Sequence, residues 1–147
     1  MTLRQWQQNG WLKPHAPSRQ EIADLYAVIE RDLAASDTKG LDDDWRFAIA
    51  YNAALPVAAT ALKAAGYEVP KGGGAHHHTI ESLRLTLGDD GTAVTLLQAF
   101  RAKRGGGVYE ATGVATETEI RELRTLATDL FRRLKAHVRS HYPTLEP

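Results

Sequence analysis

Hydrophobic residues recur along much of the chain at spacings of three and four, the period of an α-helix that buries one face. This pattern predicts five helices, over about 18–33, 42–65, 76–87, 94–104 and 117–141. No segment shows the alternation of apolar and polar residues that is typical of a half-buried strand. We therefore predict an all-α fold, an antiparallel helical bundle of about five helices. The clearest stripe belongs to the last helix: Ile120, Leu123, Ala127, Leu130, Leu134 and Val138.

Polar residues at the expected helix ends support these boundaries. Ser18 with Glu21, and Thr116 with Glu119, have the spacing of a capping box. The acidic run 42–44 opens the second helix, where carboxylates interact favourably with the positive end of the helix dipole. Gly66 follows that helix and suits a C-terminal cap.

The second helix carries one polar residue on its predicted stripe. Asn52 lies among the presumed core positions, and Pro56, four residues later, cannot donate a hydrogen bond to the Asn52 carbonyl. One interpretation is a kink in which Asn52 bonds across the bundle, and the other places Asn52 at the edge of a functional cleft. The stripe as a whole is Trp45, Ile49, Asn52, Leu55, Ala59 and Leu62.

The chain has 147 residues, enough for one domain with one core. We expect an extension over 1–17 that packs on the bundle, a helical domain over 18–142 and a tail over 143–147. The longest apolar tract, 47–65, is interrupted by polar residues and a proline, so it predicts a buried helix and no membrane partner. The first residues lack the apolar run of a signal peptide, which favours a cytoplasmic protein.

Charge and cysteine content narrow the chemistry. Eighteen Lys and Arg balance eighteen Asp and Glu, so no net field draws the protein to nucleic acid. Residues 91–147, however, carry nine basic and six acidic side chains, which makes a basic face plausible there. Without cysteine there is no thiol catalysis and no thiolate metal site.

The most informative segment is a cluster of cations before a glycine run. Counting three and four onward from Val94 and Leu97 reaches Arg101 and Arg104, so both should continue the apolar face of the fourth helix. A guanidinium removed from water needs an anionic partner, because losing its hydration costs several kcal/mol. Bundle carboxylates such as Asp24 or Asp44 would meet that need, and so would a partner subunit or a nucleic-acid phosphate.

The residues that follow favour the phosphate. Arginine grips phosphate through two parallel hydrogen bonds, and a glycine run lets backbone N–H groups approach an anion. Lys103 adds positive charge, and the Tyr109 phenol can stack on a base or donate to a phosphate oxygen. The alternative is that Tyr109 only seals the loop. The glycine run is Gly105, Gly106 and Gly107.

Three adjacent histidines, His76, His77 and His78, begin the short third helix. They could join in binding Zn²⁺ only with a ligand from elsewhere, and the spacing of the remaining histidines supplies none. We therefore predict no metal and no cofactor. One imidazole would pack near the helix start while the others are solvated. In a further interpretation, one of them approaches Arg104 and supplies an acid–base group.

The cation segment also carries a family resemblance. Arg101-x2-Arg104-x4-Tyr109-Glu110, followed by a capped long helix, resembles the core motif of the HEPN superfamily. Residues 44–55 (DWRFAIAYNAAL) and 65–67 (AGY) resemble a small bacterial branch of these proteins, and the resemblance covers roughly 18–140. It implies a helical bundle that forms a homodimer. Many HEPN proteins are metal-independent ribonucleases of toxin–antitoxin or defence systems, and others bind nucleotides or partner a nucleotidyltransferase.

The chain departs from the HEPN signature at one position. Arg104 matches the family arginine, but Gly105 replaces the usual polar neighbour and Tyr109 stands where a histidine is expected. A phenol with an ordinary pKa of about 10 is a poor general base at neutral pH. Whether the protein is an enzyme therefore stays open.

Together these observations predict a nucleic-acid- or nucleotide-associated HEPN-like protein of a toxin–antitoxin or defence system. Arg104, Tyr109 and Arg101 are its candidate catalytic residues. Its candidate partners are RNA or a nucleotide, a second copy of the chain, and a cognate antitoxin or nucleotidyltransferase. The alternative is a non-catalytic protein that uses the same arginines to dimerise or to bind a protein partner.

Overall fold

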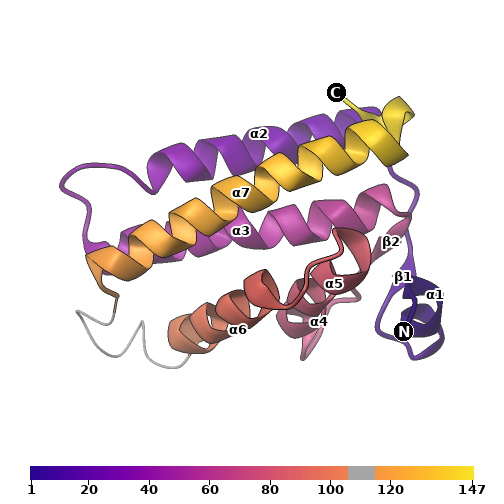
Figure 1. Ribbon diagram of the computed structural model, residues 1–147, viewed down its shortest axis with the longest axis horizontal. Coiled ribbons are helices and arrows are strands. Elements are labelled where there is room, and N and C mark those ends of the chain that lie inside the picture. The colour runs from indigo at the N-terminus through magenta and orange to yellow at the C-terminus, as the bar shows by residue number, and fades with distance from the viewer. Residues whose placement is uncertain (106–114) are drawn as a thin grey trace.

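Three long helices lie side by side and form the body of the protein in the computed structural model, which describes residues 1–105 and 115–147 (Figure 1). Shorter helices pack against α3 on the side away from α2. In the view of Figure 1, α2 and α6 run in the direction opposite to α3 and α7. The all-α prediction is thus confirmed. The elements are α2 (Arg19–Ala35), α3 (Asp43–Ala64), α4 (Ala75–Glu81), α5 (Leu83–Thr86), α6 (Thr92–Gly105) and α7 (Glu117–His141).

The last helix follows the sequence prediction closely. The Thr116 hydroxyl accepts the Glu119 N–H, and the Glu119 side chain bonds back to the Thr116 N–H, which completes the capping box. All six residues of the predicted stripe are fully buried. A helix with one strictly apolar face packs with that face toward the core, so the spacing of the apolar residues was enough to identify the buried positions.

The predicted stripe of α3 is wrong. Trp45 is 61% exposed and Asn52 is exposed, so Asn52 does not bond across the bundle interior. Because α3 lies between α2 and α7 on one side and α4 and α6 on the other, it buries more than one face. Its contacts come mainly from small residues that a search for large apolar side chains overlooks. The buried set is Phe47, Ala50, Tyr51, Ala53, Ala54, Val57, Ala58, Thr60, Ala61, Leu62 and Ala64.

The ends of α3 agree with the prediction. The Asp42 carboxylate accepts the Asp44 N–H at the start of the helix, and Gly66 takes a positive φ of 93° just beyond its end. Of the described helices, α3 alone has the length and hydropathy to cross a membrane, and 61% of its most apolar window is buried within the protein. That burial is typical of a core helix.

The N-terminal residues contain structure that the sequence pattern did not predict. A short helix, α1 (Leu3–Gln8), leads into strand β1 (Lys13–Pro14), which pairs antiparallel with β2 (Tyr67–Glu68). Trp6 and Leu12 are buried against Leu62 in a cluster separate from the main core. The N-terminal segment therefore packs at one end of the bundle (Figure 1).

Two further boundaries differ from the prediction. The predicted third helix is divided into α4 and α5 at Ser82, whose buried hydroxyl donates to the Thr79 carbonyl. After α7, a 3₁₀ turn (Pro143–Leu145) packs Leu145 onto the core. The Glu146 backbone carbonyl accepts a bond from the Arg19 guanidinium of α2 at 2.7 Å.

Candidate functional site

The cation segment occupies the last turns of α6. Arg101 and Lys103 are described with their side chains, while for Arg104 and Gly105 only the helical backbone is described. The predictions for Gly106, Gly107 and Tyr109 lie outside the described residues. The described part of the site therefore consists of Arg101, Lys103 and the side chains that contact them.

Arg101 is half-buried and bonded to a neutral group. Its Nε donates to Oε1 of Gln98, one turn earlier on α6, at 2.8 Å. Among the described residues, no carboxylate lies within ion-pair distance of Arg101. The Asp24 side chain instead accepts from Gln20. Within the described part of the chain, this arrangement differs from the predicted pairing of Arg101 with a bundle carboxylate.

Lys103 has a strong internal partner. Its Nζ lies 2.5 and 2.6 Å from the two carboxylate oxygens of Glu119, in the first turn of α7. This bond, more than any other interaction, holds the pKa of Glu119 below its ordinary value. The ion pair ties the end of α6 to the start of α7. The role predicted for Lys103 in nucleic-acid binding stays a prediction, and its charge is already matched.

A polar contact joins α6 to the histidine helix α4. The Gln98 Nε2 donates to the His77 carbonyl at 3.1 Å and to Oε2 of Glu81 at 2.9 Å. Glu81 also holds Arg84 at 3.3 Å. Gln98 thus connects Arg101 to one face of α4. Sequence reasoning missed Gln98 and Glu81 because the only available signal was spacing within each helix, which says nothing about which helices pack together.

The three histidines have different surroundings. His78 stacks on Trp11 with ring centroids 4.9 Å apart and meets the edge of Trp6 at 5.7 Å. Burial, and then the neighbouring His77, lower the pKa of His78. His76 and His77 are exposed. The interpretation in which one imidazole packs and the others are solvated is confirmed.

Two other predictions concern these histidines. Among the residues with described placement, no three metal-ligating side chains gather into a potential metal site. An approach of a histidine to Arg104 is not described, because the Arg104 side chain is outside the described set. The nearest described aromatic neighbour of His76 is Tyr51, at 6.3 Å between ring centroids.

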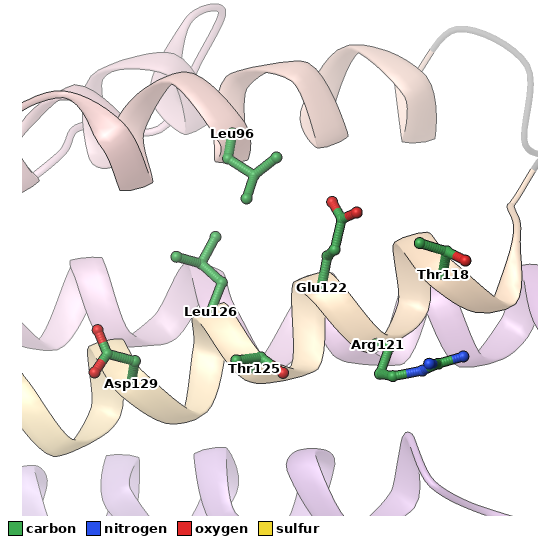
Figure 2. Close-up of a pocket in the computed structure, with 7 residues that line it drawn as sticks. All are labelled: Leu96, Thr118, Arg121, Glu122, Thr125, Leu126 and Asp129. Carbon is green, nitrogen blue, oxygen red and sulfur yellow. The ribbon is translucent and has the colours of Figure 1, made fainter.

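An apolar groove of about 480 Å³ separates α6 from α7. Figure 2 shows Leu96 of α6 and Leu126 of α7 pointing toward one another across it, with Glu122 also directed toward α6. Thr118, Arg121, Thr125 and Asp129 complete its lining.

Comparisons of the chain with protein-family models, with curated proteins and with solved structures find no match. The HEPN resemblance therefore stays a prediction from the sequence motif.

Proposed function

We propose that this chain is a HEPN-like protein that binds RNA through the cations at the end of α6, as part of a toxin–antitoxin or defence system. The observation that carries the proposal is Arg101, a half-buried guanidinium that only a neutral amide contacts among the described residues. A partly dehydrated cation without a carboxylate gains from an external anion. RNA supplies such an anion, because the planar guanidinium can donate two parallel hydrogen bonds to a phosphate.

The sequence supports the same surface. Arg104 follows one turn after Arg101 at the end of α6, and the glycine run begins at the next residue. Single-stranded RNA is bound largely through its phosphates, so two arginines three residues apart are a suitable anchor. Tyr109 would stack on a base or orient the phosphate. In this proposal the protein acts as a homodimer. A nucleotide, whose phosphates can bind the same arginines, is the smaller alternative ligand.

The test is binding of a fluorescently labelled single-stranded RNA of mixed sequence, followed by anisotropy over a series of salt concentrations. Arg101→Ala should weaken binding by about tenfold, equivalent to about 1.4 kcal/mol. It should also reduce the slope of log K against log salt by roughly 0.7, the value for one lost phosphate contact on a single strand. Arg104→Ala should act in the same direction.

Arg4→Ala is the matched control. Arg4 is an exposed arginine on α1, at the end of the molecule opposite the end of α6 (Figure 1). Removing it changes net charge by the same amount as Arg101→Ala. If the two variants weaken RNA binding equally, the interaction is a general charge effect and the proposed site is wrong.

A second function is favoured by the exposed apolar surface. Trp45 is 61% exposed in the first turn of α3, and Leu96 and Leu126 face the open groove between α6 and α7. An exposed aromatic side chain and an open apolar groove are each typical of protein-binding surfaces. In this alternative the protein is a non-catalytic HEPN-like interaction protein, and the arginines contact an acidic partner or a second copy.

RNA binding by Arg101→Ala, measured together with light scattering on Trp45→Ala and Leu126→Glu, separates the two functions. If the apolar surface holds a homodimer, either substitution should shift the protein toward the monomer mass, and Arg101→Ala should leave RNA binding unchanged. If RNA binding is the function, the arginine variants lose RNA while the mass stays that of wild type.

A further inference from the structure

We propose that His137 and His141 bind a divalent transition-metal ion of the class of Zn²⁺ and Cu²⁺ at the C-terminal end of α7. The two residues are four apart on one helix, so their side chains lie on the same face, about one turn apart. Two histidines of a helix bind one metal ion with this spacing. The inference goes beyond RNA binding and does not depend on it. The prediction of no metal overlooked this pair, although its spacing is visible in the sequence.

The two imidazole rings already lie side by side. Their centroids are 4.2 Å apart and their planes differ by 25°. Two imidazoles that share one ion, each with a metal–nitrogen distance of about 2.0–2.1 Å, have ring centres roughly 4.5–5 Å apart. The rings of His137 and His141 therefore need only a small side-chain rotation to share a metal ion.

The backbone sets the tautomer of His141. Its Nδ1 lies 3.2 Å from the His137 carbonyl oxygen, and because a carbonyl can only accept, Nδ1 must carry the hydrogen. The neutral ring then has a free lone pair on Nε2, which is the form that binds a metal. Histidine ligands in metal sites commonly donate their second ring nitrogen to a carbonyl in this way, which fixes the orientation of the ring.

The end of the chain holds the histidine pair in place. The Tyr142 ring makes an edge contact with the His137 ring, with centroids 5.7 Å apart, and it packs against the core. Leu145 of the 3₁₀ turn also packs onto the core, and the next carbonyl, that of Glu146, accepts from Arg19 of α2. Ligands that are ordered before the ion arrives lose less conformational entropy when they bind it.

The local charges are compatible with a doubly charged cation. His141 is the last residue of α7, and the C-terminal end of a helix carries partial negative charge that favours cations. The Arg139 guanidinium donates to the Glu146 carboxylate at 2.8 Å, so its positive charge is matched. The Lys135 ammonium lies over the ring of Phe131, 4.3 Å from its centroid.

The ligand set selects the kind of metal. Imidazole suits Zn²⁺, Cu²⁺ and Ni²⁺, whereas Mg²⁺ and Ca²⁺ prefer oxygen ligands. In the part of the chain that the structure describes, no third histidine or carboxylate joins the pair, so the other coordination positions are open to water or to an incoming ligand. With two protein ligands to impose a geometry, affinity should follow the general order for divalent ions, in which Cu²⁺ is bound more tightly than Zn²⁺.

The test uses the full chain, freed of metal with EDTA and then dialysed. Isothermal titration calorimetry with Cu²⁺, and separately with Zn²⁺, should show one tight site per chain, with the higher affinity for Cu²⁺. His141→Ala should weaken Cu²⁺ binding about 100-fold, because the second imidazole binds at a high effective concentration once the first is attached. His137→Ala should act in the same direction. In NMR spectra of wild type, a small amount of paramagnetic Cu²⁺ should broaden the ring protons of His137 and His141 first.

His77→Ala is the matched control, because it also removes one exposed histidine, from the run at the start of α4. Its affinity for Cu²⁺ should equal that of wild type. Since the His141 side chain is exposed as well, circular dichroism of His141→Ala should match wild type, so a loss of binding in that variant reports the metal site and not the fold.

Three results would overturn the inference. If wild type binds Cu²⁺ no more tightly than His141→Ala does, the two rings do not share an ion. If His77→Ala weakens binding as much as His141→Ala, or if broadening begins at His76, His77 and His78, the metal binds the histidine run of α4. RNA binding is measured separately, so the failure of this inference leaves the proposed function standing.

Discussion

The buried carboxylate of Asp89 should be one of the most important polar groups for the stability of α6. Its side chain is 3% exposed, and its Oδ2 accepts the N–H groups of Gly91 and Val94 at 2.9 and 3.2 Å. Its Oδ1 lies 3.4 Å from the Arg133 guanidinium of α7. Asp89 thus satisfies unpaired donors at the start of α6 and links that end of the helix to α7.

Asp89→Ala removes all of these interactions. Losing a helix N-cap costs about 1 kcal/mol, and leaving one partner of a buried ion pair alone costs about 3–5 kcal/mol. At 3.4 Å the pair is long and Arg133 is partly exposed, so we expect the ion pair to contribute less than that range, about 2 kcal/mol, and the total to be about 3 kcal/mol. Asp89→Asn keeps an oxygen that accepts N–H groups and should cost only about 1 kcal/mol.

Urea unfolding followed by circular dichroism measures this free energy. With a slope of about 1.5 kcal/mol per molar, Asp89→Ala should lower the midpoint by about 2 M. Asp24→Ala, which removes an exposed carboxylate, is the control and should stay within about 0.5 kcal/mol of wild type. If Asp89→Ala is no less stable than Asp24→Ala, the carboxylate does not stabilise α6 and the reasoning is refuted.

Three more predictions concern other contacts. Trp11→Ala should speed amide hydrogen exchange in residues 1–17, because the stacking of the Trp11 ring on His78 of α4 holds this N-terminal segment. Exchange in α7 should stay unchanged. Since the pKa of His78 is lowered in the folded state, stability should be full above pH about 6.5 and fall below it, and His78→Gln should weaken this loss in urea titrations from pH 7 to 5. His137, whose pKa burial also lowers, should keep part of the loss in that variant. Lys103→Met should cost about 1 kcal/mol at pH 7 and progressively less as the pH falls below 4.5, because the lowered pKa of Glu119 stabilises the fold only while that carboxyl is ionised.

Each of these has its own contrary result. Uniformly faster exchange in Trp11→Ala would mean that the N-terminal segment unfolds together with the bundle. An unchanged pH dependence in His78→Gln would assign the acid sensitivity to other groups. A Lys103→Met penalty that does not decrease as the pH falls below 4.5 would show that the lysine acts through packing.

The sequence predicted the buried face correctly where the core residues of a helix are large, and incorrectly where they are small. In α7 the core positions are large aliphatic residues such as Leu123 and Leu130, so the spacing of the apolar residues identifies the buried positions. In α3 the buried residues are largely alanines, whose small side chains give a weak periodic signal, and Trp45 misled the choice of stripe. The helix over 3–8 is only six residues long and is held by Trp6, a tertiary contact that no local pattern reveals.

The candidate site was predictable only in part. The arginines, the histidines and the capping box of Thr116 were visible in the sequence, because each depends on residues close together in the chain. The contacts of Gln98 with His77 and Glu81 join residues 17 to 21 positions apart. Such pairings depend on how α4 packs against α6, which periodicity within a helix does not determine.

The alanine-rich surface of α3 has a consequence for which substitutions the chain can accept over evolutionary time. Ala50, Ala54, Ala58 and Ala61 are almost fully buried within the main core. Because protein interiors are close-packed, a larger side chain at any of these positions must displace a whole helix. The exposed positions of α7 carry no such restriction. We expect natural variation to be concentrated on the outer surface of α7, while these buried positions of α3 vary only among the smallest residues.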